Sequence, residues 1–226
     1  NNVVITDLIS NAINKLSNQH QNHISSKKPK ANSCGDNLIY SIENNILDIS
    51  GSGEMYDFSL YFNQPPWYSF NQNITTIKVN NGVESLGEYC FVYCSKVTSI
   101  SLPETLISIN RCSFYSCSSI ESIQLPKSLT TLGESAFPMC NHLISIELPS
   151  SLQSIGSTLF SSCFNLKTVI LPNSLTEICT QMFYMCPHIV SLDIPQSVKT
   201  IGVEAFYECF GLKSINVPEG VTLIDK

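Results

Sequence analysis

Residues 121–143 read ESIQLPKSLTTLGESAFPMCNHL, and residues 190–212 read VSLDIPQSVKTIGVEAFYECFGL. Both stretches place an aliphatic residue, a free residue, a second aliphatic and a proline in the same columns, followed later by a phenylalanine and, three residues on, a cysteine. A fixed period of 20 to 50 residues is typical of a solenoid, in which each coil is one repeat. The columns recur every 23 residues without an insertion: phenylalanine at 91, 114, 137, 160, 183 and 206, cysteine at 94, 117, 140, 163, 186 and 209, and proline at 103, 126, 149, 172, 195 and 218.

Each part of the repeat has a mechanical interpretation. The Ile-x-Leu segment alternates with period two, which predicts a short strand with its aliphatic side chains inward. The proline after it lacks an amide donor and ends the strand ladder at a corner, and glycine in a later column suits a second corner. The Ala-Phe-x-x-Cys stretch predicts a short helical turn that buries the phenylalanine. One coil cannot bury this stripe alone, so we expect stacked coils with a parallel ladder and a continuous phenylalanine spine.

These two stretches, together with SISLPETLISINRCSFYSCSSI at 99–120, resemble the BspA-like branch of leucine-rich repeats. The resemblance covers about residues 36–226. It implies an α/β repeat fold that is mainly β, a right-handed leucine-rich-repeat solenoid of 23-residue coils with an N-terminal β-hairpin cap. It also implies kinship with surface or secreted proteins of mucosal bacteria and protists, some of which adhere to extracellular matrix or host cells.

Three segments follow from the pattern. Residues 1–33 combine a helical spacing of apolar residues over 3–17 with a polar linker. Residues 34–73 form the cap, since residues 38–50 alternate on both sides of Asn44-Asn45 as in a hairpin, and Trp67 is interpreted as a cap core residue. Residues 74–226 form the solenoid, whose last coil stops before its phenylalanine and cysteine. We expect either a longer parent protein or a second copy to cover that coil.

Composition argues against several classes of function. The net charge is -6, and because residues 1–33 carry +3, the rest carries -9, which repels nucleic acid. No apolar run reaches the ~18 residues of a membrane helix. The chain opens with Asn1 and has no recognisable signal peptide, as expected of a processed or trimmed product.

Catalytic and metal-binding motifs are also missing from the sequence. The four histidines and ten cysteines show no motif of a nucleophile, a phosphate loop or a zinc site. We therefore predict no enzyme activity, no cofactor and no metal. The cysteines are expected to be buried free thiols, with paired neighbours in adjacent coils as the alternative, and Cys34 and Cys112 are expected to be the most exposed.

The predicted binding surface is the concave face of the strand ladder. Residues flanking the inward aliphatics point outward there, and most are small and polar; Ile170 is the apolar exception. The loops on the opposite side are expected to be less constrained in shape. The contact residues are Lys78, Ser101, Gln124, Glu147, Ile170, Asp193 and Asn216, and the sequon Asn73-Ile74-Thr75 marks Asn73 as a glycosylation site.

The functional prediction is a non-enzymatic protein-binding module. Its resemblance to the BspA-like branch favours an extracellular or cell-surface adhesin that binds host or matrix macromolecules. The alternative is an intracellular, cytoplasmic scaffold that self-assembles into a homo-oligomer through the N-terminal helix or the open C-terminal coil.

Overall fold

The computed structural model describes residues 32–226. The chain divides into two units, Asn1–Ala31 and Asn32–Lys226. The helix predicted over residues 3–17 lies outside the described residues, and so does nearly all of its linker.

A β-hairpin begins the described unit, as the sequence predicts. β1 (Leu38–Glu43) pairs antiparallel with β2 (Ile46–Gly51). The two residues between them, Asn44 and Asn45, have φ angles of 51° and 63°, the left-handed conformation that a two-residue hairpin turn requires. Because β2 then pairs in parallel with β4 (Thr76–Val79), the hairpin leads directly into the stack of coils.

The cap has an aromatic core around Trp67. This side chain is fully buried, which confirms its interpretation as a cap core residue. Its ring lies 5.2 Å from that of Tyr40, 5.8 Å from that of Phe58 and 6.0 Å from that of Phe91, measured between centroids. Its indole N–H donates to the Cys90 carbonyl at 2.7 Å. The cap therefore supplies both an apolar surface and a polar bond to the first coil.

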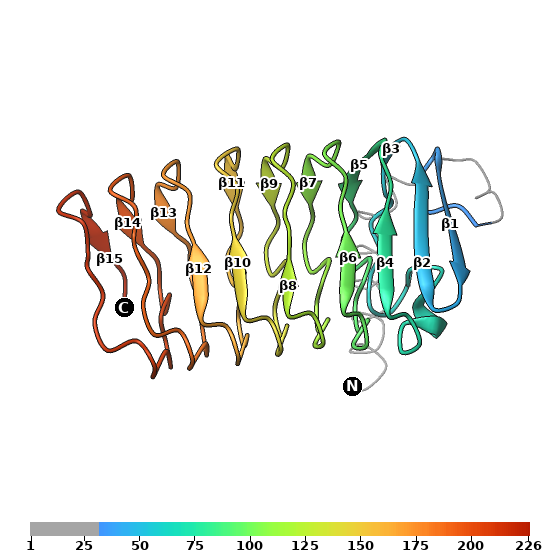
Figure 1. The fold of residues 1–226 in the computed structure, drawn as a ribbon. Coiled ribbons are helices and arrows are strands. Elements are labelled where there is room, and N and C mark those ends of the chain that lie inside the picture. Colours follow the sequence, from blue (N-terminus) through green and yellow to red (C-terminus); the bar gives the residue numbers. More distant parts are fainter. Residues whose placement is uncertain (1–31) are drawn as a thin grey trace, which may run out of the picture. The chain divides into compact units, whose positions relative to one another are not determined.

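The predicted parallel ladder is present, and we call it the first ladder. It runs as a sheet of order β1-β2-β4-β6, which is parallel from β2 onward, and a second sheet of order β12-β10-β8 (Figure 1). In the three-residue strands the central aliphatic side chain points inward and its neighbours point outward, for example in β10, where only Ile146 is buried. The strands are β6 (Ser99–Ser101), β8 (Ser122–Ile123), β10 (Ser145–Glu147) and β12 (Thr168–Ile170).

A second parallel ladder, which the repeat pattern does not predict, forms after the proline corner. Its sheets have the orders β11-β9-β7-β5-β3 and β13-β14-β15, and they make up the other row of strands in Figure 1. Most of these strands are two residues long, too short for an alternating pattern to show. They are β3 (Gly53–Glu54), β5 (Val83–Leu86), β7 (Ser108–Ile109), β9 (Thr131–Leu132), β11 (Ser154–Ile155), β13 (Glu177–Ile178), β14 (Thr200–Ile201) and β15 (Leu223–Ile224).

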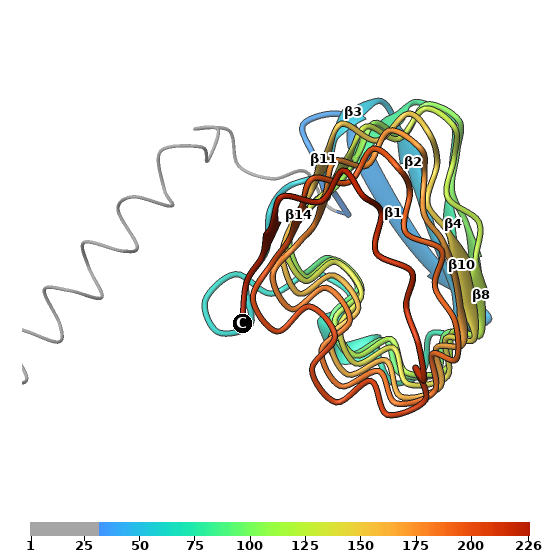
Figure 2. The ribbon, with the colours of Figure 1, turned by 90° about the vertical axis from the view of Figure 1, so that its left-hand side faces the viewer.

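The third side of each coil, from the glycine column to the cysteine, is here called the turn face. The short helical turn predicted there is wrong: within residues 32–226 the single helical element is the 3-10 helix η2 (Tyr68–Phe70) of the cap. The coils instead make successive turns with two left-handed residues four apart, such as Ser135 (φ 52°) and Met139 (φ 57°). Viewed along the stack, the coils share one outline (Figure 2).

This turn geometry has a clear physical consequence. It aims alternate amides at the next coil, so that the N–H groups of Ser135, Phe137 and Met139 donate to Ser157, Leu159 and Ser161 at 2.9, 3.1 and 2.8 Å. A helix would have used those amides internally. The expectation that these loops are loosely shaped is therefore also wrong, because they are hydrogen-bonded from coil to coil.

The phenylalanine column forms the predicted spine. Phe91, Phe114, Phe137 and the next two members of the column are at most 1% exposed, and successive ring centroids are 5.1 to 6.0 Å apart. Phe206, in the last complete coil, is only half-buried and packs against the core. A spine of stacked rings explains why no insertion interrupts the 23-residue period.

Candidate binding surface

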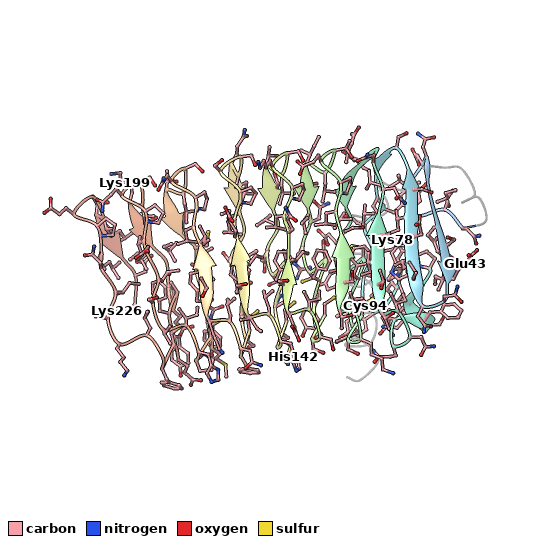
Figure 3. All side chains as sticks on the ribbon, in the orientation of Figure 1. Glu43, Lys78, Cys94, His142, Lys199 and Lys226 are labelled. Atoms are coloured by element: carbon pink, nitrogen blue, oxygen red, sulfur yellow. The ribbon has the colours of Figure 1, made fainter. Side chains whose placement is uncertain are left out.

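All seven side chains predicted as contact residues are exposed. Lys78 lies beside Ser101, Glu147 beside Ile170, and Asp193 beside Asn216, as register partners of parallel neighbours. Lys78 is labelled on β4 in Figure 3. Ile170 is 53% exposed although the adjacent Val169 is 6% exposed, so the strand alternates inward and outward as expected. We call this set the contact column: Lys78, Ser101, Gln124, Glu147, Ile170, Asp193 and Asn216.

Two further apolar side chains extend this surface. Ile144 is 42% exposed and Val190 is 63% exposed. They occupy the column directly before the strand, one coil before and one coil after Ile170. Sequence reasoning misses them because that column lies outside the Ile-x-Leu alternation. Their presence means that Ile170 is not an isolated apolar residue but one of three in successive coils.

A shallow hollow lies beside the first ladder, next to the residues that directly precede β10 and β12. It measures about 160 Å³ and is lined by Glu121, His142, Ile144, Asn165 and Lys167. Opposite charges and one apolar side chain meet there. Such a hollow suits one side chain of a partner better than a small-molecule substrate, which normally fills a cavity of ~300 Å³ or more.

The histidines in the solenoid link adjacent coils. His142 Nδ1 lies 2.6 Å from the Ser118 carbonyl oxygen (His142 is labelled in Figure 3). One coil later, the Asn165 side-chain amide donates to the Asn141 carbonyl at 2.7 Å, and His188 Nδ1 bonds Phe164 in the same way. The column therefore has a structural function in stacking. Among residues 32–226, no cluster of three potential metal ligands is found.

The ten cysteines are free and buried, in agreement with the favoured prediction. In the cysteine column, here called the thiol ladder, the thiols from Cys117 onward donate to the phenylalanine carbonyl of the coil before; Cys117, Cys163 and Cys186 bond Phe91, Phe137 and Phe160, each at 3.1 Å. This bond explains why the column selects cysteine. Burial raises the pKa of the Cys94 and Cys140 thiols to about 12, so both are protonated at neutral pH.

The exposure predicted for Cys34 and Cys112 is wrong. Cys34 is fully buried beneath the cap hairpin, where its N–H donates to the Leu38 carbonyl and its own carbonyl accepts from Tyr56. Cys112 is 4% exposed and lies at a left-handed corner, where its thiol interacts with Tyr89. Neither position belongs to the cysteine column, so the repeat gave no information about its burial.

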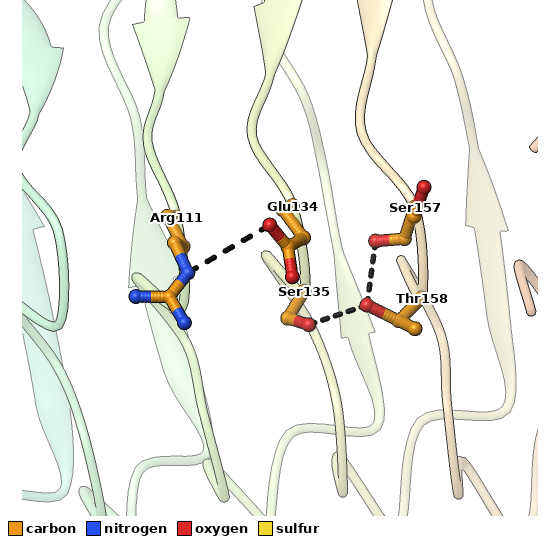
Figure 4. A network of polar contacts seen from close by, with 5 residues as sticks. All are labelled: Arg111, Glu134, Ser135, Ser157 and Thr158. Atoms are coloured by element: carbon orange, nitrogen blue, oxygen red, sulfur yellow. Dashed lines mark hydrogen bonds and ion pairs between the residues drawn. The ribbon is translucent and has the colours of Figure 1, made fainter. Parts of the chain in front are cut away.

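The corner between the second ladder and the turn face carries a polar network (Figure 4). Arg111 and Glu134 form an ion pair at 3.9 Å, and the hydroxyls of Ser135 and Thr158 lie 2.5 Å apart. The ion pair is about half exposed, and pairs of this kind contribute little stability. Because these groups bond adjacent coils to each other, we interpret the polar network at this corner as part of the contact between coils.

Residues 66–189 and 133–226 match the family model of the BspA type leucine rich repeat region, in six copies. The chain belongs to the BspA-type leucine-rich repeat family. Leucine-rich repeat proteins of this kind are generally protein-interaction modules with a non-enzymatic repeat fold. Comparison with curated proteins returns no match. Within residues 32–226, no helix is long and apolar enough to cross a membrane.

Solved structures share this fold. A leucine-rich repeat protein from Bacteroides ovatus is 26% identical with a TM-score of 0.69, over 85% of this chain and 55% of that chain. A leucine rich repeat protein of T. pallidum is 23% identical with a TM-score of 0.65, over 84% of this chain and 92% of that one. A third, from Eubacterium ventriosum, has 22% identity and a TM-score of 0.57, over 84% and 60%. The chain thus spans little more than half of the Bacteroides protein.

Proposed function

We propose that this chain is the protein-binding module of a surface or secreted adhesin, and that it binds a host or matrix macromolecule through the contact column. The family supports a non-enzymatic interaction module. The BspA-like resemblance favours the surface location.

The observation that carries the proposal is the arrangement around Ile170. This apolar side chain is 53% exposed, Glu147 is its register partner, and Asp193 follows one coil later in the same column. An apolar centre bordered by charged groups is the usual anatomy of a protein contact, since the centre loses water on binding and the rim gives specificity. The two carboxylates favour a partner segment with basic groups on either side of an apolar anchor.

The test is a binding screen followed by matched variants. Wild type is screened against matrix proteins, host-cell surfaces and glycans, and any ligand found is titrated with Ile170→Asp and with Glu147→Lys/Asp193→Lys. We expect each variant to weaken binding by at least ~1 kcal/mol without lowering the melting temperature. Val203→Asp is the control, because Val203 is a 40% exposed apolar residue away from the first ladder. Unchanged affinity in both test variants, or an equal loss in the control, contradicts the proposal.

Asn73 is proposed as a glycan acceptor if the chain is secreted from a eukaryotic cell. Its side chain is exposed three residues after the end of η2, and Thr75, which completes the sequon, is partly buried. The expected result is a mass increase on expression in a eukaryotic secretory host that Asn73→Gln abolishes. An unmodified secreted product contradicts this site.

The second candidate is a cytoplasmic scaffold that self-assembles. It is favoured by the exposed apolar side chains of β15, where Leu223 is 50% and Ile224 is 59% exposed. Sedimentation velocity of wild type and Leu223→Ser/Ile224→Ser distinguishes the candidates: a dimer that the double variant dissociates favours assembly, and a concentration-independent monomer contradicts it.

Mass measurement with and without reductant counts disulfides, which the secreted function permits and the cytoplasmic one disfavours.

A further inference from the structure

The two strand ladders are interrupted at one shared junction. The sheet of the first ladder that contains β8 and β10 ends at β12, and the second ladder divides between β11 and β13. Because β12 and β13 follow each other along the chain, both interruptions separate the same two groups of residues. We call residues 32–170 the N-terminal stack and residues 177–226 the C-terminal stack.

The first ladder has another interruption, between β6 and β8, but there the second ladder stays paired through β5 and β7. At the shared junction both ladders are open. The turn face alone continues across it, with the N–H groups of Thr158, Phe160 and Ser162 donating to residues 180, 182 and 184 at 2.9, 2.9 and 2.8 Å. In residues 32–226, every backbone hydrogen bond between the two stacks is therefore on the turn face.

The residue at the corner explains the opening. At Gly133, Gly156 and Gly202 the backbone N–H donates to the coil before at 2.8 Å. A Cβ at these glycines would lie 2.5, 2.3 and 2.6 Å from the nearest backbone nitrogen of that coil. Cys179 occupies this column between Gly156 and Gly202. A side chain at such a position therefore lies close against the backbone of the coil before.

Cys179 also takes the acceptor that the ladder would use. Its thiol donates to the Ile155 carbonyl at 3.2 Å, where a glycine of this column would donate its N–H. Asn110 stands in the same column, yet its backbone N–H still donates to Leu86 at 3.0 Å. A side chain in this column is thus compatible with a paired ladder. What distinguishes Cys179 is the hydrogen bond from its thiol to the Ile155 carbonyl.

We propose that the solenoid bends at this junction, with the turn face as the hinge and Cys179 as the residue that keeps the strand side unpaired. The stacked rings of Phe160 and Phe183, 5.8 Å apart, lie across the junction and limit the motion to bending. Ile170 and Asp193, neighbours in the contact column, lie on opposite sides. If the proposed function holds, a partner that contacts both side chains selects one spacing between the stacks; the hinge itself does not depend on that function.

Amide hydrogen exchange resolved by residue tests the hinge without a ligand. The N–H groups of Thr176 and Cys179 should exchange at least about tenfold faster than their equivalents Gln153 and Gly156, which donate across a paired junction at 2.9 and 2.8 Å. Cys179→Gly should slow both to the rates of those equivalents. The Phe160 amide, on the turn face, is the control and should stay protected in both proteins. Equal exchange at the two junctions of the wild type overturns the proposal, even if the variant fails to fold.

A distance measurement checks that the opening lets the stacks move. Nitroxide labels at Ser101 and Asp193 span the junction, and labels at Lys78 and Ile170 lie within the N-terminal stack; each pair is four coils apart, roughly 19 Å along the stack. Since the native thiols are buried, introduced cysteines are labelled selectively. The spanning pair should give the broader distance distribution, and Cys179→Gly should narrow it. Equal widths for the two pairs contradict bending.

Discussion

The first ladder and the turn face arise from the same repeat but hold the stack differently. Beyond the cap hairpin, the first ladder consists of two- to four-residue strands, and it is interrupted between β6 and β8 and after β12. The turn face keeps its coil-to-coil hydrogen bonds at both interruptions. It also contains the buried phenylalanine spine and the thiol ladder. Coil-to-coil cohesion therefore depends most on the turn face, which leaves the outward residues of the first ladder free to serve binding.

The largest expected effect comes from the spine. Phe137→Ala removes a fully packed ring between Phe114 and Phe160 and should lower the free energy of unfolding by ~3 to 5 kcal/mol. Chemical denaturation provides the measurement. Phe210→Ala is the control, because that ring is 78% exposed and its loss should cost well under 1 kcal/mol. Similar losses for the two variants would contradict a spine that holds the coils.

The thiol ladder predicts a dependence on pH. Burial raises the pKa of the Cys94 and Cys140 thiols from an ordinary 9.0 to about 12. The two thiols therefore make their full contribution to the free energy of unfolding below pH 9. That contribution is lost as the pH rises from 9 toward 12, because the thiols ionise at a lower pH in the unfolded chain than in the folded one. Each thiol should contribute a slope of about 1.4 kcal/mol per pH unit in that range. Denaturant midpoints from pH 7 to 11 measure this loss.

Cys140→Ala serves as the matched variant for the pH experiment. It should be less stable than wild type at pH 7, where the thiol bond is intact, and its stability should fall less steeply above pH 9. A slope identical to that of wild type would place the ionising groups elsewhere.

The left-handed positions of the turn face predict a small gain. Ser116 has a φ of 59°, which a side chain disfavours and glycine tolerates. Ser116→Gly should therefore be neutral or stabilising by up to ~1 kcal/mol, whereas Ser119→Gly, three residues on and not left-handed, should destabilise by roughly 0.5 to 1 kcal/mol. Thermal melts of the pair measure the difference, and the opposite order would refute the turn geometry.

The sequence predicts the features that repeat and misses those set by local geometry. Identical columns identify the solenoid, the spine, the first ladder and the exposure of the contact column, because one coil conformation must serve every copy. The second ladder is missed because pairs such as Ser108–Ile109 are too short to alternate. The turn face is misread as helical because Ala-Phe-x-x-Cys spacing also suits a helix, and left-handed φ angles at serine or methionine leave no trace in composition.

The candidate surface follows the same rule. Ile170 is predicted as exposed because it interrupts a polar column, whereas Ile144 and Val190 belong to a corner column of mixed character and give no such signal. The role of Cys179 could be suspected from its place among glycines, but the paired ladder at Asn110 shows that substitution alone does not predict an opening. The bond from its thiol to Ile155 is visible only in three dimensions.

The most direct test of the division between the two faces is the unfolding free energy of a triple variant of the contact column, Glu147→Lys/Ile170→Asp/Asp193→Lys. All three side chains are exposed, so we expect its free energy of unfolding to lie within about 1 kcal/mol of wild type, a change well below the loss in Phe137→Ala. Chemical denaturation of the three proteins under one condition supplies the comparison. A triple variant that loses as much stability as Phe137→Ala would contradict this division, since the contact column would then be part of what holds the coils together.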